Sequence, residues 1–118
     1  MKNEAVEPTT TYEEFLHSVI RVGRVVDARP NEKARNPAHI LEVDFGESVG
    51  VKSTSAQIVD NYPDPQALVG RQVAAVVNLP VKKIAGFRSE VLLLAATTPD
   101  GSVLLKPDQV VENGSQVR

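Results

Sequence analysis

Two apolar runs that flank a short basic loop, all within residues 70–96, constrain the fold of this chain most strongly. The first run, residues 73–77, is rich in small and β-branched side chains, and the second, residues 91–96, is rich in leucine. Each run has the length of one strand, whereas a helix usually needs ten or more residues. Pro80 cannot donate to a sheet ladder, and Gly86 can adopt a positive φ that reverses the chain. The stretch therefore predicts two strands joined by a loop that presents polar and basic side chains.

Alternating apolar positions predict further strands on both sides of this stretch. They are residues 19–29, residues 40–45, a strand that starts at Val49 and forms a hairpin with the preceding one, and residues 103–105. In the first strand, Ile20, Val22, Val26 and Ala28 share one parity and are expected to face inward. Arg24 interrupts that pattern, so a β-bulge is expected at Gly23. Five or six short strands in this arrangement predict an all-β chain, folded as a five-stranded Greek-key barrel of the OB type.

The two ends of the chain are expected to differ in structure. Residues 1–11 are polar and predict a disordered N-terminal segment, which leaves residues 12–118 as one domain. Thr11 and Glu14 have the spacing of a capping box, so residues 12–16 predict a short helix. Phe15 and Leu16 would then anchor this helix to the core.

Both predicted strands of the central stretch are apolar on both faces, although one face of an antiparallel strand is normally solvated. The outer face therefore needs a cover. The N-terminal helix and the C-terminal tail are one candidate, a second subunit is another, and both arrangements are compatible. We expect a two-fold homodimer with a dimerising tail, and an obligate interface of this kind should bury more than about 2,000 Å² in total.

The 118 residues suit one domain, and they offer little that would support catalysis. The chain has no cysteine, and its two histidines lack metal-ligand spacing. A nucleophile elbow and a phosphate-cradling glycine loop are also absent from the sequence. We therefore expect no enzyme activity, no metal and no cofactor. The N-terminus has no apolar signal segment, and no apolar run could span a bilayer, which predicts a cytoplasmic protein without membrane insertion.

The distribution of charge leaves two interpretations of the basic loop open. The formal net charge is −2, yet residues 21–88 hold ten Lys and Arg against seven Asp and Glu. Lys82, Lys83 and Arg88 can form a phosphate-binding patch or only a solvated turn. The few aromatic residues argue against general single-strand binding, which stacks bases on aromatic side chains. Recognition of a folded RNA through its shape and backbone, or of an extended polypeptide in an apolar groove, fits the composition better.

Seven sequence blocks occur in a recognisable order: Arg21-Val22-Gly23, Pro37-Ala38, Val43-Asp44-Phe45-Gly46, Ser55-Ala56-Gln57-Ile58, Val76-Val77-Asn78-Leu79-Pro80, Ile84 to Leu92, and Leu104 to Gly114. Together these blocks resemble the tRNA-binding domain family and most closely its CsaA-type members, small dimeric export-related chaperones. The same domain is similar to one appended to some methionyl- and phenylalanyl-tRNA synthetases. The resemblance implies an OB-fold homodimer that binds polypeptide, tRNA or both.

The resemblance also implies a set of binding residues. Its polar pocket corresponds to Ser53, Ser55, Gln57, Asn78, Ser89 and Glu90, and its basic rim to Lys52, Lys82, Lys83 and Arg88. On this basis we expect a chaperone for unfolded or presecretory polypeptides. The alternative is a tRNA-binding accessory protein.

Overall fold

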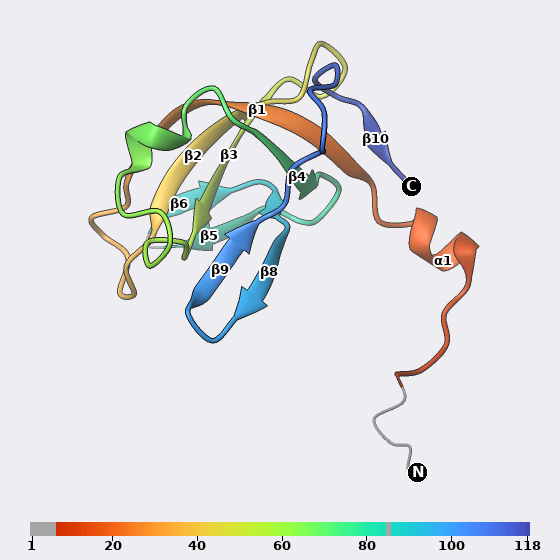
Figure 1. Ribbon diagram of the computed structural model, residues 1–118, viewed down its shortest axis with the longest axis horizontal. Helices are drawn as coiled ribbons and strands as arrows, with labels where there is room; N and C mark the ends of the chain where they lie inside the picture. The colour runs from red at the N-terminus through yellow and green to blue at the C-terminus, as the bar shows by residue number, and fades with distance from the viewer. Residues whose placement is uncertain (1–6, 85) are drawn as a thin grey trace.

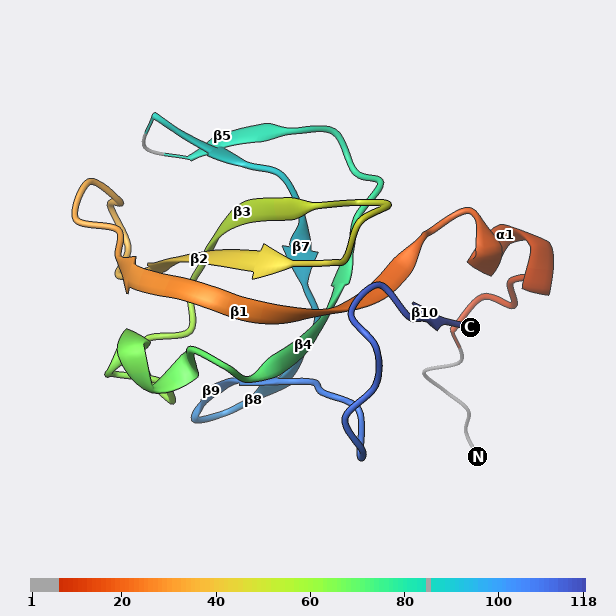
Figure 2. The same cartoon turned by 90° about the horizontal axis from the view of Figure 1, so that it is seen from above.

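A strongly bent sheet with the strand order β3-β2-β1-β4-β7 forms the body of a nearly closed all-β barrel (Figures 1 and 2). The computed structural model describes residues 7–84 and 86–118. Its elements are α1 (Tyr12–Leu16), β1 (Ile20–Pro30), β2 (His39–Asp44), β3 (Val51–Ala56), the 3-10 turn η1 (Pro65–Leu68), β4 (Gln72–Val76), β5 (Lys82–Ile84), β6 (Phe87–Ser89), β7 (Leu92–Leu93), β8 (Ala95–Thr98), β9 (Gly101–Leu104) and β10 (Gln116–Val117). The predicted fold class, an OB-type barrel with one short N-terminal helix, is confirmed.

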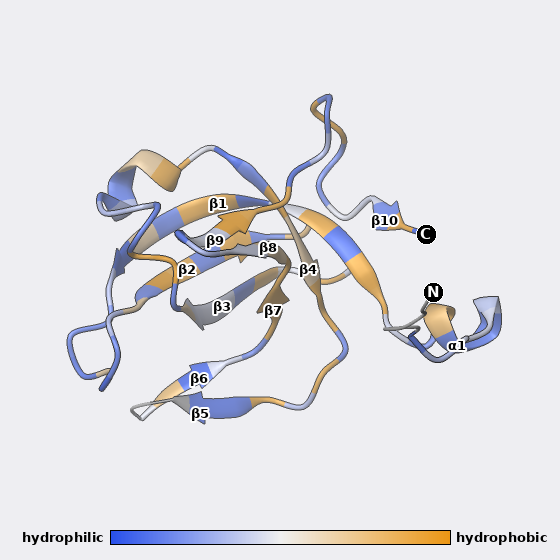
Figure 3. Cartoon of the chain, turned by 60° about the horizontal axis from the view of Figure 1, so that its bottom comes forward, coloured by the Kyte–Doolittle hydropathy of each residue, from blue (hydrophilic) through white to orange (hydrophobic). Residues whose placement is uncertain are grey.

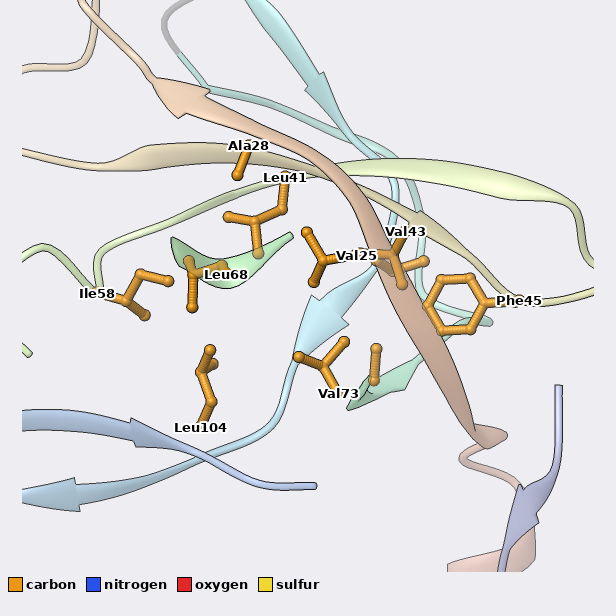
Figure 4. Close-up of a cluster of buried hydrophobic side chains, with 11 residues drawn as sticks. Val25, Ala28, Leu41, Val43, Phe45, Ile58, Leu68, Val73 and Leu104 are labelled. Carbon is orange, nitrogen blue, oxygen red and sulfur yellow. The ribbon is translucent and has the colours of Figure 1, made fainter. Parts of the chain in front are cut away.

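The core of the barrel is formed by inward-facing side chains of β1, β2 and β4 (Figure 4). Leu41, Val43 and Phe45 alternate along the β2 segment and are at most 1% exposed, as the sequence pattern predicts. Leu68 of η1 and Leu104 of β9 close the two sides of this cluster. Burial of these aliphatic groups supplies the main favourable term in folding.

The C-terminal segment covers the outer face of β4. All five residues of this strand are buried, including Gln72, Ala74 and Val76, which face outward. The Gln72 amide donates to the Val111 carbonyl at 2.6 Å, and the Ala74 N–H donates to the Leu105 carbonyl at 3.3 Å. The apolar surplus of this strand is therefore buried within one chain, so it does not by itself require a second subunit.

The β-bulge of β1 lies at Val26, which corrects its predicted position at Gly23. The register with β2 shifts between Val25 and Asp27, so Val25 faces the core while Val26 points outward and is 46% exposed. Gly23 is needed for a different reason. A Cβ atom there would lie 2.6 Å from Val43 Cγ1, so only glycine fits against the neighbouring strand.

Helix α1 forms as predicted but does not pack on the core, so its expected anchoring was wrong. Thr11 accepts the N–H of Glu14 at 3.1 Å, and the Glu14 carboxylate accepts the N–H of Thr11 at 3.1 Å, which completes the capping box. The helix has no buried residue, and Phe15 and Leu16 are 36% and 41% exposed. Figures 1 and 2 show α1 projecting beyond the end of β1. Of the predicted disordered segment, residues 1–6 lie outside the described residues.

The second apolar run and the basic loop are more structured than predicted. The run breaks into β7 and β8, and β8 pairs with β9 instead of extending the main sheet. The loop between the two runs is itself a two-stranded ribbon, β5–β6, with Gly86 at a φ of 79° in its turn. The short strand β10, which the sequence pattern does not predict, adds to the edge of β1. No helix in residues 7–84 and 86–118 is long and apolar enough to cross a membrane.

Candidate binding site

Side chains, rather than a backbone ladder alone, close the barrel between β3 and the start of β7. The Ser53 N–H donates to Glu90 Oε1 at 2.9 Å, and the Glu90 N–H donates to the Ser53 carbonyl at 2.8 Å. The buried Ser89 hydroxyl accepts the Ser55 N–H at 3.2 Å, and Thr54 Oγ1 donates to the Val91 carbonyl at 2.8 Å. This closure ends at Ser55, and beyond it β3 separates from β7 and β8.

A hollow of about 350 Å³ opens where the barrel is not closed, and we call it the main hollow. Aliphatic side chains form most of its wall, with polar groups at the rim. Its lining residues are Ala56, Ile58, Leu79, Pro80, Val91, Leu92, Leu93, Ala95 and Leu104, together with Thr54, Ser55, Gln57, Lys82, Ser89, Glu90 and Ser102. In Figure 3 the neighbouring β7 is coloured as hydrophobic and β5 as hydrophilic. A concave apolar surface with a few polar groups is the usual form of a binding site.

The structure brings half of the predicted site residues together at the main hollow. Ser55, Gln57, Lys82, Ser89 and Glu90 line it. Lys52, Ser53, Asn78, Lys83 and Arg88 do not. Ser53 uses its backbone to hold Glu90, and Lys52 lies one residue before Ser53 in β3.

Asn78 does not line the main hollow, and its side chain binds the segment between α1 and β1. Its Nδ2 donates to the His17 carbonyl at 2.7 Å, and its Oδ1 accepts the Val19 N–H at 2.9 Å. These bonds connect the segment between α1 and β1 to the end of β4. In the structure the Asn78 amide thus holds the N-terminal segment in place.

The basic side chains of the ribbon are divided between its two faces. Lys82 lies opposite Ser89, and Lys83 lies opposite Arg88. Directly opposed residues share one face and successive residues alternate, so the pair Lys83 and Arg88 faces away from the main hollow. The three ribbon cations of the basic rim implied by the resemblance are therefore divided, with Lys82 on the face of the main hollow and Lys83 and Arg88 on the other face.

The β1–β2 loop supplies functional candidates that the sequence analysis missed. Lys33 and Arg35 line a second hollow of about 300 Å³, which we call the loop hollow. Its other lining residues are Ala34, Asn36, Ala38, Ser55 and Gln57. OB-folds bind ligands on the face of the second and third strands and with the flanking loops, which is where both hollows lie. Applied to residues 31–38, that rule could have identified Lys33 and Arg35 as candidates from the sequence.

Arg29 is close to this region, but its guanidinium already forms ion pairs with two carboxylates. Hydrogen bonds to Glu42 and then Asp27 raise the pKa of Arg29, at 3.1 Å and 2.8 Å respectively. Its charge is therefore less available to a ligand than the charges of Lys33 and Arg35.

A family model described as "Putative tRNA binding domain" matches residues 20–116, which is nearly the whole barrel. The chain belongs to the tRNA-binding domain family. Methionine–tRNA ligase of Pyrococcus abyssi is 32% identical over 117 residues, which cover 99% of this chain and 16% of the ligase. The chain therefore spans about one sixth of the length of this curated relative.

Solved structures of small family members are similar over their whole length. Chaperone CsaA from Bacillus anthracis has a TM-score of 0.87 and 42% identity, covering 94% of this chain and 100% of that one. The CsaA chaperone protein from Picrophilus torridus has a TM-score of 0.86 and 41% identity, with coverage of 93% and 100%. The resemblance inferred from sequence is thus confirmed, and the tRNA-binding domain here has the barrel of the CsaA proteins.

Proposed function

We propose that this chain is a non-catalytic chaperone that binds unfolded or presecretory polypeptides in the cytoplasm. The main hollow carries this proposal, because its wall is largely aliphatic and none of the described residues that line it is aromatic. Such a wall suits the aliphatic side chains of an extended polypeptide better than it suits bases, which stack on aromatic rings. The similarity to two CsaA chaperones supports the same function.

Suppression of aggregation tests this function. An unfolded client protein is diluted into buffer with the chain at equal concentration, and light scattering is followed. We expect scattering to fall, and we expect Leu79→Ser to weaken the protection because Leu79 lines the main hollow and is 45% exposed. Val110→Ser is the matched control, since Val110 is 76% exposed and lies outside the hollow. Absence of protection by the unchanged chain would rule the function out.

We further propose that the chain acts as a homodimer through the outer face of the sheet. One apolar row crosses four neighbouring strands, because each of its residues lies opposite the next. The row consists of Val117 on β10, Ile20 on β1, Val76 on β4 and Leu92 on β7. Val117 and Leu92 at the two ends of this row are 39% and 52% exposed. Leu16 lies beside Ile20 and Val117 at one end of the row, and it is also exposed. A two-fold interface at the Val117 end of the row would bury Val117, Ile20 and Leu16 on both copies and leave Leu92, which lines the main hollow, open to a client.

Sedimentation velocity at micromolar concentration tests the dimer. We expect Val117→Asp to shift the chain toward monomer, because it places a charge at the end of the apolar row. Val103→Asp is the control, since Val103 is 42% exposed but lies on β9, outside the row. A monomeric unchanged chain would contradict the proposal.

Binding of tRNA is the second candidate function. The family match favours it, as do the cationic side chains around the face of β2 and β3. They are Lys33 and Arg35 on the β1–β2 loop and Lys82, Lys83 and Arg88 on the ribbon. Phosphate contacts release counterions, so the affinity for tRNA should fall steeply as salt rises. A flat salt response, or no binding at low salt, would exclude this function.

A further inference from the structure

The main hollow and the loop hollow adjoin each other. Ser55 and Gln57 line both of them, so they are joined over the end of β3. These two residues are two positions apart, which is about 7 Å in an extended chain. A single short extended segment can therefore occupy both hollows at once.

The loop that carries the cations is held in place by one buried side chain. Asn31 is 7% exposed, and its Nδ2 donates to Ser55 Oγ at 3.1 Å. Its Oδ1 accepts the Lys33 N–H at 3.3 Å, and its own N–H donates to the Ala38 carbonyl at 2.9 Å. Such bonds between an asparagine and its own loop define a turn. Lys33 and Arg35 are thus presented from an ordered turn attached to β3.

The loop hollow is positive, because the described residues that line it include Lys33 and Arg35 and no Asp or Glu. Both ion pairs that the structure shows within residues 7–84 and 86–118 belong to Arg29, so Lys33 and Arg35 have no carboxylate partner there. The neighbouring Glu32 does not line the loop hollow; it lines a different hollow, which Lys33 and Phe87 also line. A cleft lined by one sign of charge attracts ligands of the opposite sign.

We propose that the loop hollow is a subsite for acidic side chains and makes the chain selective among polypeptide clients. It rests on the proposed chaperone function. A client segment places an aliphatic side chain in the main hollow and a nearby Asp or Glu carboxylate between Lys33 and Arg35. Polypeptide is favoured over RNA as the occupant because the adjoining wall is aliphatic.

Three matched peptides test the proposal. They share one leucine-containing core, which is flanked on both sides by Asp, by Asn or by Lys. Binding is measured by fluorescence anisotropy of a labelled peptide. We expect the Asp-flanked peptide to bind about two- to fivefold more tightly than the Asn-flanked one, as exposed charge pairs usually contribute, and the Lys-flanked one to bind least. The difference should shrink at high salt.

Charge variants assign the preference to the loop hollow. Lys33→Ala/Arg35→Ala should remove the preference for Asp, and Lys33→Glu/Arg35→Glu should reverse it toward Lys. Lys106→Ala/Arg118→Ala removes two exposed cations that line neither hollow and should leave it intact. Melting curves check that each variant is folded.

Three results would overturn the proposal, and they are distinguishable. Equal affinity for the three peptides removes the acidic subsite but leaves the chaperone function standing. No affinity for any of them removes both. If Lys33→Ala/Arg35→Ala weakens tRNA binding and leaves the peptide preference unchanged, the loop hollow binds phosphate instead.

Discussion

Lys82 and Lys83 are neighbours in sequence, yet their side chains project from opposite faces of the β5–β6 ribbon. Lys82 shares a face with the buried Ser89 and lines the main hollow, whereas Lys83 shares a face with the exposed Arg88. A ligand that covers one face cannot contact both ammonium groups equally. The pair therefore separates the effects of the two surfaces of the ribbon.

Replacing both lysines by alanine should weaken tRNA binding uniformly across sequences. The salt slope should fall by up to about two, roughly one for each phosphate that the protein no longer neutralises. Client binding should persist, and unfolding free energy should change by less than about 0.5 kcal/mol, as for most surface substitutions. Because the faces differ, we expect Lys82→Ala alone to account for most of the weakening and Lys83→Ala for little. The reverse order would place the RNA on the outer face of the ribbon.

Ser89→Ala should destabilise the barrel where side chains close it. The Ser89 hydroxyl accepts the Ser55 N–H at 3.2 Å and lies 3.1 Å from Thr54 Oγ1. Its removal leaves a backbone donor without its partner, which costs about 1–3 kcal/mol. Urea denaturation measures the change. Ser48→Ala, in an exposed turn, is the control and should be nearly neutral. Equal stability of the two variants would mean that the Ser89 hydroxyl does not close the barrel.

Gly114→Ala should cost much more stability than Gly70→Ala, although both glycines have positive φ. A Cβ at Gly114 would lie 2.5 Å from the Phe45 carbonyl oxygen, whereas nothing lies within 4 Å of a Cβ at Gly70. The left-handed conformation alone costs about 1–2 kcal/mol for alanine. Gly70→Ala should show that cost, and the backbone contact should add to it in Gly114→Ala. Thermal unfolding compares the two, and similar melting temperatures would show that the tail moves away from Phe45 without cost.

Acid should release the capping box of α1 before the barrel unfolds. Hydrogen bonds from Thr10 and Thr11 lower the pKa of Glu14 below its ordinary value of 4.5. A carboxyl with a lowered pKa stabilises the folded helix above that ordinary value, and the contribution is lost as pH falls through the folded pKa. The protection factor of the Glu14 amide, which corrects for the intrinsic slowing of exchange in acid, should therefore fall as pH drops below 4.5, and Glu14→Gln should remove that pH dependence. If the protection of the Glu14 amide did not change with pH, the carboxylate would not have this role.

Local patterns in the sequence predicted the elements that depend on local chemistry. The alternation of Leu41, Val43 and Phe45 specified the inner face of β2, and Thr11 with Glu14 specified the helix start. The position of the bulge could not be predicted in this way. Gly23 was a reasonable candidate for the bulge by residue type, but glycine is needed there because Val43 approaches closely from the neighbouring strand.

The binding site was less predictable, because its parts come together only through tertiary contacts. The blocks around Ser55 and Ser89 carried the family pattern, and both line the main hollow. Nothing in the local sequence shows that Asn31 attaches its loop to Ser55, 24 residues away. The cations on that loop were therefore missed, while Asn78 was assigned to the pocket although its amide binds His17 and Val19.

The pairing of Ile20 with Val117 brings the first and last strands of the barrel side by side. From there β1 runs to Pro30, next to the loop hollow, a path of up to about 33 Å. Both ends of the fold thus leave from one pole of the molecule, and the loop hollow lies near the other. With this geometry, another domain can be fused at either end of the barrel without covering the loop hollow. The same holds for a circular permutation that joins the two ends and opens the chain at the turn around Asp100.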